Sequence, residues 1–183
     1  MASATDQALT KLTISNDGRY YYIRSDAPFG YFDKFCYMGD EKPATNALFE
    51  IVHRCGSDFV SFHAPFFNGS YLAVNTDNSK ATTLKEMEHF TGRLFLFNSK
   101  MSKKLDTNAE KFELFVPVNT ASTSTDNKEG EGVRAIIRSV ANQRFLVVKP
   151  GGSPFACGKD PSLATVFVFE QRLNFSSKRK TRK

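Results

Sequence analysis

Tryptophan is absent from this 183-residue sequence, and cysteine is scarce. The three cysteines, Cys36, Cys55 and Cys157, are odd in number and have no C-x-x-C spacing, which argues against a disulfide framework and a zinc site. We expect reduced, partly buried thiols. No apolar stretch is long enough for a signal peptide or a membrane-spanning helix. These absences lead us to expect a soluble, cytoplasmic protein.

Motifs of common enzyme classes are also missing. The sequence has no G-x-S-x-G elbow, no G-x-x-x-x-G-K phosphate loop and no paired-carboxylate motif. The segment "KPGGSPFACG" contains Gly-Gly, but no helix follows it, so we interpret it as a tight turn between two strands. We therefore expect no catalysis and no cofactor.

The three histidines do not form a metal-binding motif. His53, His63 and His89 are far apart, without His-x-His or His-x-x-His spacing and without an acidic partner at a repeated offset. We expect ordinary surface or partly buried histidines and no metal site.

Positive charge is concentrated at the C-terminus. The net charge is +6, from 25 basic and 19 acidic residues. Five basic residues lie in the last six positions, which leaves 20 against the 19 acidic ones, so the rest of the chain is almost neutral. We call these five residues the basic tail: Lys178, Arg179, Lys180, Arg182 and Lys183. This distribution makes nucleic acid an unlikely partner of the folded domain.

One pattern of turn and apolar residues occurs three times. The segments "SNDGRYYYIRSDA", "FFNGSYLAVNTDN" and "VANQRFLVVKPGG" each place a turn or polar segment before a strand-like run. A second run follows in each copy: "ATNALFEIV", "HFTGRLFLF" and "LATVFVFEQ". Alignment of the copies predicts six equivalent buried residues. They are Tyr21, Leu72 and Leu146 in the first runs, and Phe49, Phe95 and Phe167 in the second runs.

Each copy offers about four short strands. Initial strands are expected at 11–15, 58–64 and 133–139, and weaker third strands at 32–39, 80–86 and 153–159. No segment has sustained helical periodicity, and 18 phenylalanines supply large side chains for a closed β structure. The sequence thus predicts one all-β domain of three four-stranded repeats with pseudo-threefold symmetry. The expected repeats span about 9–54, 58–98 and 133–172, after an N-terminal extension over 1–8.

An insert over about 100–132 separates repeats two and three. Its segment 111–118 is apolar and should be ordered, either as an extra edge strand or as an extension of a neighbouring strand. Residues 119–132 are rich in Ser, Thr, Asn and Gly, which predicts a mobile, protease-sensitive loop. The domain should end near residue 173, followed by a C-terminal segment over 174–183.

The repeats resemble a known fold. A "G-x-Y-L-x-V" strand and an "x-F-x-F/V" strand in each of three units look like the β-trefoil, and "NGSYLAVN" with "NQRFLVVK" resembles the fascin and hisactophilin group of actin-binding proteins. The third copy also resembles fibroblast growth factors. The resemblance covers 9–173 apart from the insert, and it implies filamentous actin as partner, with no catalysis. Fold alone does not specify function, because trefoils carry many functions.

Two basic clusters are the candidate actin-binding sites. One is the basic tail, and the other, which we call the Lys100 cluster, comprises Lys100, Lys103 and Lys104. Such clusters would steer association with an acidic filament, and bundling would require two contacts or self-association. Solvated charge runs, and nuclear import through the tail, remain alternative interpretations. Other functions left open are a carbohydrate-binding lectin, disfavoured by the lack of Gln-x-Trp, and a heparin- or receptor-binding growth-factor-like protein.

Overall fold

The computed structural model describes residues 9–14, 19–26, 30–33, 36–40, 42–44, 47–54, 56–76, 91–98, 108–118 and 132–172. Within these ranges, twelve strands form a single connected sheet, and one three-residue 3-10 helix spans Pro161–Leu163. The strands divide into three units of four.

The strand bounds are as follows. Unit one contains β1 (Tyr20–Ser25), β2 (Tyr31–Phe32), β3 (Met38–Asp40) and β4 (Phe49–His53). Unit two contains β5 (Val60–Ala64), β6 (Ser70–Val74), β7 (Leu94–Phe97) and β8 (Phe112–Phe115). Unit three contains β9 (Val133–Ser139), β10 (Phe145–Val148), β11 (Pro154–Gly158) and β12 (Phe167–Gln171).

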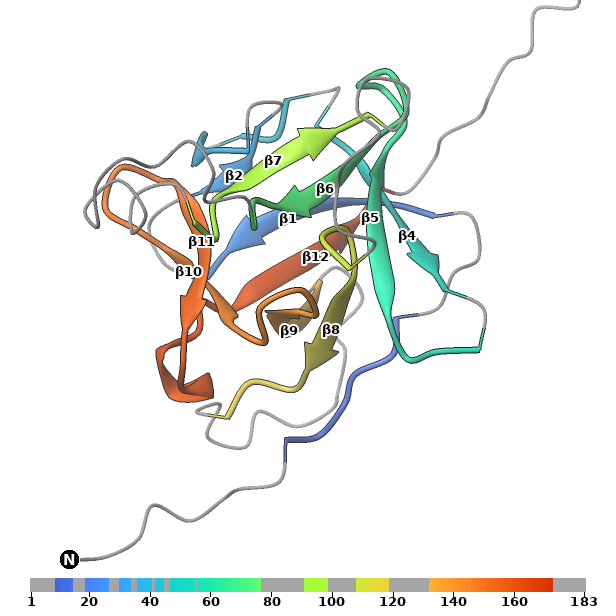
Figure 1. Cartoon of the computed structure of the whole chain (residues 1–183). Coiled ribbons are helices and arrows are strands. Elements are labelled where there is room, and N and C mark those ends of the chain that lie inside the picture. The colour runs from blue at the N-terminus through green and yellow to red at the C-terminus, as the bar shows by residue number, and fades with distance from the viewer. Residues whose placement is uncertain are drawn as a thin grey trace, which may run out of the picture.

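The first and last strands of each unit close a barrel. Antiparallel pairing runs from β1 to β4, β5, β8, β9 and β12, and β12 pairs β1 again. The middle strands pair with each other as the hairpins β2–β3, β6–β7 and β10–β11. Figure 1 shows these strands around a common centre, with β6–β7 at the top and β10–β11 at the left. A six-stranded barrel with three hairpins is the β-trefoil architecture, so the predicted fold class is confirmed.

Equivalent cross-strand pairs reveal the pseudo-threefold symmetry. Tyr21 lies opposite Phe49 in unit one, Val60 opposite Phe112 in unit two, and Ala135 opposite Phe167 in unit three. All six side chains are buried. Period-two alternation explains this, because in a closed barrel every second residue of a strand must face the interior.

The predicted set of equivalent core residues needs a correction in unit two. Five of the six residues are buried, but Phe95 is partly exposed. It lies on the hairpin strand β7, where Leu94 and Leu96 face the core instead. The residue equivalent to Phe49 and Phe167 is Phe112. Because "RLFLF" and "TVFVF" both alternate with period two, the sequence pattern alone did not distinguish a hairpin strand from a barrel strand.

The predicted alignment of the first repeat with the other two is also wrong, by one strand. Tyr21 lies in the first strand of its unit, whereas Leu72 and Leu146 lie in second strands. Residues 11–15, predicted as an initial strand, contribute one isolated bridge between Lys11 and Phe115. The third strand predicted at 80–86 lies outside the described residues.

The segment 111–118 is part of unit two and not of an insert. It contains β8, which pairs with β5 and β9 and therefore closes the barrel. Neither expected alternative, an edge strand or an extension, is correct. The connection between units two and three follows β8, and the loop predicted over 119–132 lies outside the described residues except for Gly132.

An N-terminal segment completes the seam between β5 and β8. These two strands pair at Val60 and Phe112, and beyond that point residues 10–12 take the place of β5. The Leu12 backbone N–H donates to the Leu114 carbonyl at 2.9 Å, and the Val116 N–H donates to the Thr10 carbonyl at 2.9 Å. The segment thus satisfies backbone groups that β8 would otherwise expose.

Aromatic rings fill the barrel. Phe62 lies 5.3 Å from Phe112 and 5.9 Å from Phe169 between ring centroids, and Phe32 lies 5.9 Å from Phe49. Burial of each such ring stabilises the fold by about 1.5–3 kcal/mol before the entropy cost. The core therefore joins all three units, which fixes the positions of the surface residues described next.

Candidate functional site

The predicted actin-binding residues lie outside the part of the chain that the structure describes. This applies to the whole Lys100 cluster, Lys100, Lys103 and Lys104, and to the basic tail, Lys178, Arg179, Lys180, Arg182 and Lys183. The structure instead defines the surface of the barrel to which these segments are attached.

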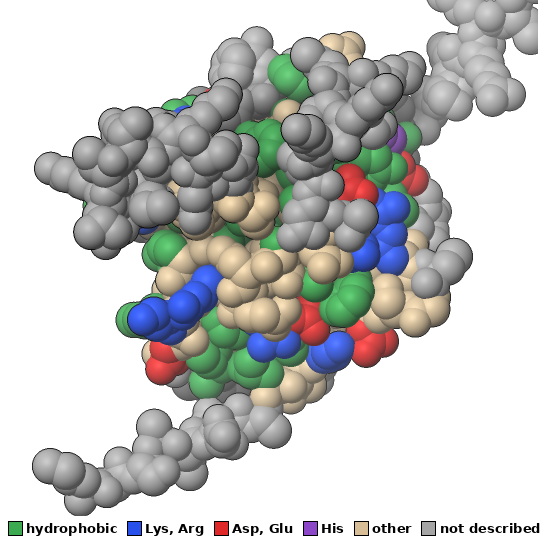
Figure 2. Space-filling model, in the orientation of Figure 1, with side chains coloured by type: hydrophobic (Ala, Val, Ile, Leu, Met, Phe, Trp, Pro, Cys, Tyr) green, Lys and Arg blue, Asp and Glu red, His purple; other side chains and the backbone are tan. Residues whose placement is uncertain are grey.

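Six carboxylates on the described barrel are engaged by basic side chains. Figure 2 shows acidic and basic side chains next to one another on the visible face. The contacts join residues that are distant in sequence, and several join different units. The pairs are Arg24 with Glu170, Arg134 with Asp26, Arg54 with Glu110, His63 with Glu50, Lys11 with Asp58, and Arg138 with Glu113.

One polar network connects β4 with unit two. Arg54 lies 2.5 Å from a carboxylate oxygen of Glu110 and donates from Nε to Ser61 Oγ at 2.9 Å. Ser61 Oγ in turn donates to the Glu110 carbonyl at 2.7 Å. The Arg54 guanidinium also lies 5.4 Å from the centre of the Tyr71 ring. Since the members use one another as partners, the network fastens the β4–β5 corner.

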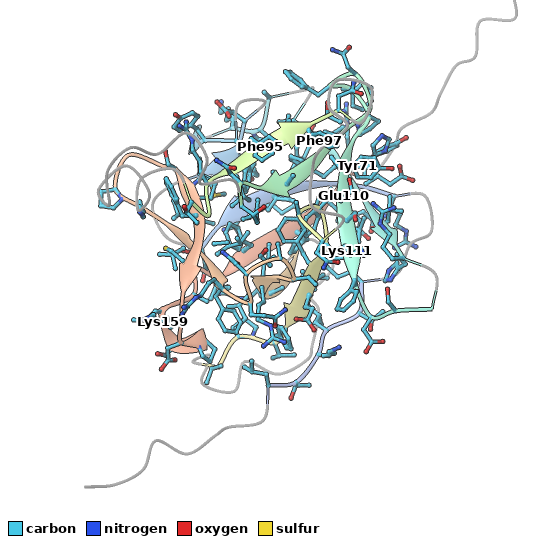
Figure 3. All side chains as sticks on the ribbon, in the orientation of Figure 1. Tyr71, Phe95, Phe97, Glu110, Lys111 and Lys159 are labelled. Atoms are coloured by element: carbon cyan, nitrogen blue, oxygen red, sulfur yellow. The ribbon has the colours of Figure 1, made fainter. Side chains whose placement is uncertain are left out.

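Aromatic side chains border this network on the outer face of the β6–β7 hairpin. Tyr71 is the cross-strand neighbour of Phe97, and the Phe95 and Phe97 rings are 6.5 Å apart (Figure 3). The His63 ring packs at a tilt against Tyr71 with 4.9 Å between ring centroids, and its Nδ1 lies 3.0 Å from Glu50 Oε2. All these side chains are partly exposed. The Glu50 carboxylate and the Tyr71 ring therefore hold His63 in place, which favours a structural role for this histidine.

Glu113 is the most buried carboxylate that the structure describes in an ion pair. Its side chain is about 8% exposed, and its Oε2 lies 2.7 Å from Arg138 Nη2. Arg138 Nε donates to the same oxygen at 2.8 Å, while its guanidinium lies 4.9 Å from the Phe115 ring centre. Lys11 Nζ approaches the other oxygen at 3.5 Å. These contacts offset the desolvation of the carboxylate and serve the barrel, not a ligand.

Histidines and cysteines are dispersed over the described surface. His53 Nε2 lies 2.6 Å from the Ile14 carbonyl, which ties β4 to the N-terminal segment. Cys36 is buried as expected, and burial, with Asp33 nearby, raises the pKa of its thiol to about 12. Cys157 is exposed, so the expectation of partial burial is wrong there. His89 and Cys55 lie outside the described residues.

The described residues contain no group of three or more His, Cys, Asp and Glu side chains that could hold a metal ion. In the same ranges, no helix has the length and apolar character needed to cross a membrane.

A second group of cations makes no ion pair with a described carboxylate. Its members are Lys42, Arg93, Lys111, Arg144, Lys149 and Lys159. Three of the six belong to the β10–β11 hairpin or its immediate flanks, and Arg93 bridges to that hairpin at Phe155. Figure 3 shows Lys159 at the outer edge of unit three. Half of these cations therefore lie in or beside unit three.

Comparisons with known proteins bear on the fold. No protein-family model matches the chain, and no curated protein matches its sequence. The solved structure of a designed threefold symmetric protein, ThreeFoil, is similar with a TM-score of 0.50 and 11% sequence identity, covering 82% of this chain and 97% of that chain. At this identity the likeness supports the trefoil architecture and carries no statement about function.

Proposed function

We propose that this protein is a non-enzymatic, cytoplasmic binding protein that attaches to filamentous actin through basic segments carried on a β-trefoil. The observation that carries the proposal is the separation of charge. Barrel carboxylates such as Glu110, Glu113 and Glu170 are engaged by barrel cations. Carboxylates that are already engaged in this way compete less with an acidic partner for the Lys100 cluster and the basic tail.

Actin is the partner that the sequence favours. The segments "NGSYLAVN" and "NQRFLVVK" resemble fascin-like repeats, and in the structure they lie across β6 and β10, the second strands of two units. Each exposed lysine contributes little alone, but several together raise the rate of encounter with an acidic filament. Two separate basic segments also allow a second filament contact, which is the requirement for bundling.

Co-sedimentation with filamentous actin tests the proposal directly. The intact protein should pellet with filaments at high speed at low salt, and salt should weaken the binding. Pelleting at low speed would report bundling. A chain truncated after Ser177 and the Lys100/Lys103/Lys104→Ala variant should each lose more bundling than binding. Lys42→Ala/Lys159→Ala, which also removes exposed charges, is the matched control and should behave like the parent.

Three outcomes would contradict this proposal. If the intact protein never pellets with actin, the partner is wrong. If both variants bundle like the parent, the choice of residues is wrong. Binding that salt does not weaken would indicate an apolar contact, for which Phe66, 44% exposed on the β5–β6 turn, is the first residue to test.

A further inference from the structure

Three hairpins meet at one end of the barrel, and each contributes to a surface that the sequence does not reveal. The Met38 N–H of unit one donates to the Gly152 carbonyl of unit three at 2.8 Å, and the Ala156 N–H of unit three donates to the Gly92 carbonyl of unit two at 2.7 Å. These bonds hold the three turns together. Side chains beside them are therefore placed by the closure of the whole fold.

Four of these side chains form what we call the hairpin cap: Tyr37, Arg93, Lys149 and Phe155. Arg93 Nη2 donates to the Tyr37 hydroxyl, and its guanidinium lies 5.5 Å from the centre of that ring. Lys149 Nζ lies 4.0 Å from the centre of the Phe155 ring. Phe155 is also the bridge partner of Arg93. Each of the two cations thus lies on an aromatic ring, and Phe155 links the two pairs, because its backbone bridges to Arg93 and its ring carries Lys149.

The cap retains positive charge at a partly exposed surface. Arg93 and Lys149 are half-buried and make no ion pair with a described carboxylate, while Tyr37 is 38% exposed. Asp33 is a described carboxylate close to this turn, and one of its oxygens accepts the Tyr37 backbone N–H at 2.9 Å. A cation positioned on a ring loses less side-chain freedom when an anion binds, so fixed cations are well suited to recognition.

We infer that the hairpin cap is a docking surface for a carboxylate-rich segment of a protein partner. This inference rests on the proposed function, in which it would be a third contact with the acidic filament, now on the barrel itself. Charge complementarity supports an anionic partner. The rings argue against single-stranded nucleic acid, because base stacking needs an open ring face. Arg93 lies over one face of Tyr37, and Phe155 is only 5% exposed beneath Lys149, so neither ring leaves both faces open.

The test uses the full-length chain and labelled poly-L-glutamate, followed by fluorescence anisotropy at low and physiological salt. Arg93→Gln/Lys149→Gln removes both cap charges. Lys42→Gln/Lys159→Gln removes two exposed charges elsewhere and is the matched control. We expect about a fivefold loss of affinity in the cap variant, as for two modest charge contacts, and less than a twofold loss in the control.

A third variant separates charge from folding. Arg93→Lys/Lys149→Arg keeps both charges and should retain most of the affinity, while circular dichroism and thermal unfolding report whether each variant remains folded. Equal losses in the cap and control variants would overturn the inference. So would a parent protein that does not bind polyglutamate, or one that binds an oligodeoxythymidine of equal charge more tightly.

Actin sedimentation of the same variants distinguishes failure of the inference from failure of the proposed function. If the parent binds polyglutamate through the cap but never pellets with filaments, the cap is retained and the actin partner is rejected. If the parent pellets with filaments and the cap variant pellets equally well, the actin partner is retained and the cap is rejected as a contact.

Discussion

Units two and three each contribute two barrel strands and one hairpin, but they use different lengths of chain to do so. Unit three completes its four strands between Val133 and Gln171, whereas unit two extends from Val60 to Phe115. The excess lies on both sides of β7, which begins at Leu94 after β6 ends at Val74. The two units nevertheless present matching buried residues to the core. A trefoil unit is thus specified by its inward-facing side chains and tolerates long connections, because closure entropy rises slowly with loop length.

The largest expected effect breaks the equivalence between Phe112 and Phe95. Phe112→Ala should lower the free energy of unfolding by about 3–5 kcal/mol, because it leaves a cavity in the barrel. Phe95→Ala should cost about 1 kcal/mol, because Phe95 is partly exposed on a hairpin. Urea unfolding of both variants gives the comparison. Equal losses, or a larger loss at Phe95, would mean that the barrel register described above is wrong.

A second prediction concerns how the unit three hairpin meets unit one. A Cβ at Gly152, where φ is +82°, would lie 1.9 Å from the Met38 carbonyl oxygen, whereas a Cβ at Gly151, where φ is +92°, meets nothing within 4 Å. Gly152→Ala should therefore cost about 3 kcal/mol, from strain and from overlap with backbone. Gly151→Ala should cost about 1 kcal/mol, from backbone strain alone. Thermal unfolding measures both, and similar values would contradict the close approach.

A third prediction uses a position at which the two units differ chemically. Glu113 in β8 and Val168 in β12 occupy equivalent positions, because each directly follows the equivalent core phenylalanine of its strand. Arg138→Leu should cost about 2 kcal/mol, less than a fully buried pair, because the carboxylate loses its main partner while Arg138 itself is about 27% exposed. Adding Glu113→Val should recover part of this loss. A double-mutant cycle in urea checks the coupling, and strict additivity would show that the pair is not coupled.

The smallest effect is expected at the exposed Lys11–Asp58 pair, whose side chains are 45% and 76% exposed. Asp58→Asn should change the free energy of unfolding by less than about 0.5 kcal/mol. The hydrogen bond to Asp58 is the main cause that raises the pKa of Lys11 above 10.5. A lysine whose pKa is raised in the folded state stabilises the fold fully at pH values below its ordinary pKa. This stabilisation is lost as pH rises through the raised pKa of the folded state. The difference in unfolding free energy between parent and variant should therefore be smaller at pH 11 than at pH 8; a difference that grows with pH would contradict this assignment.

The fold was predictable from sequence because its signal is repeated. Phe49 and Phe167 were correctly placed in the core by period-two alternation, and three copies of that pattern predicted threefold closure. In unit two the sequence pattern indicates β7 as the last barrel strand instead of β8, because a long connection precedes β8. The sequence does contain a signal for it: "FEI" at Phe49 and "FEL" at Phe112 match more closely than "FLF" at Phe95. A constant repeat length hides this similarity, because it places the last strand of unit two at Phe95.

The candidate surfaces were less predictable for a physical reason. A run of lysines such as the Lys100 cluster is visible in any sequence, since its members are neighbours in the chain. The hairpin cap joins Tyr37, Arg93 and Lys149, whose sequence separations give no pattern. Whether a cation is matched or left unmatched also depends on partners far away in the chain, as for Arg24 and Glu170, 146 residues apart.

By itself, the sequence determined that this protein is all-β, that it has three repeats, and that residues such as Phe49 and Phe167 face the core, because these properties follow from local periodicity. Only the tertiary structure decided which strand closes unit two, which carboxylates are engaged, and where positive charge remains unmatched. Each of those properties depends on contacts between units, and such contacts exist only once the barrel has closed.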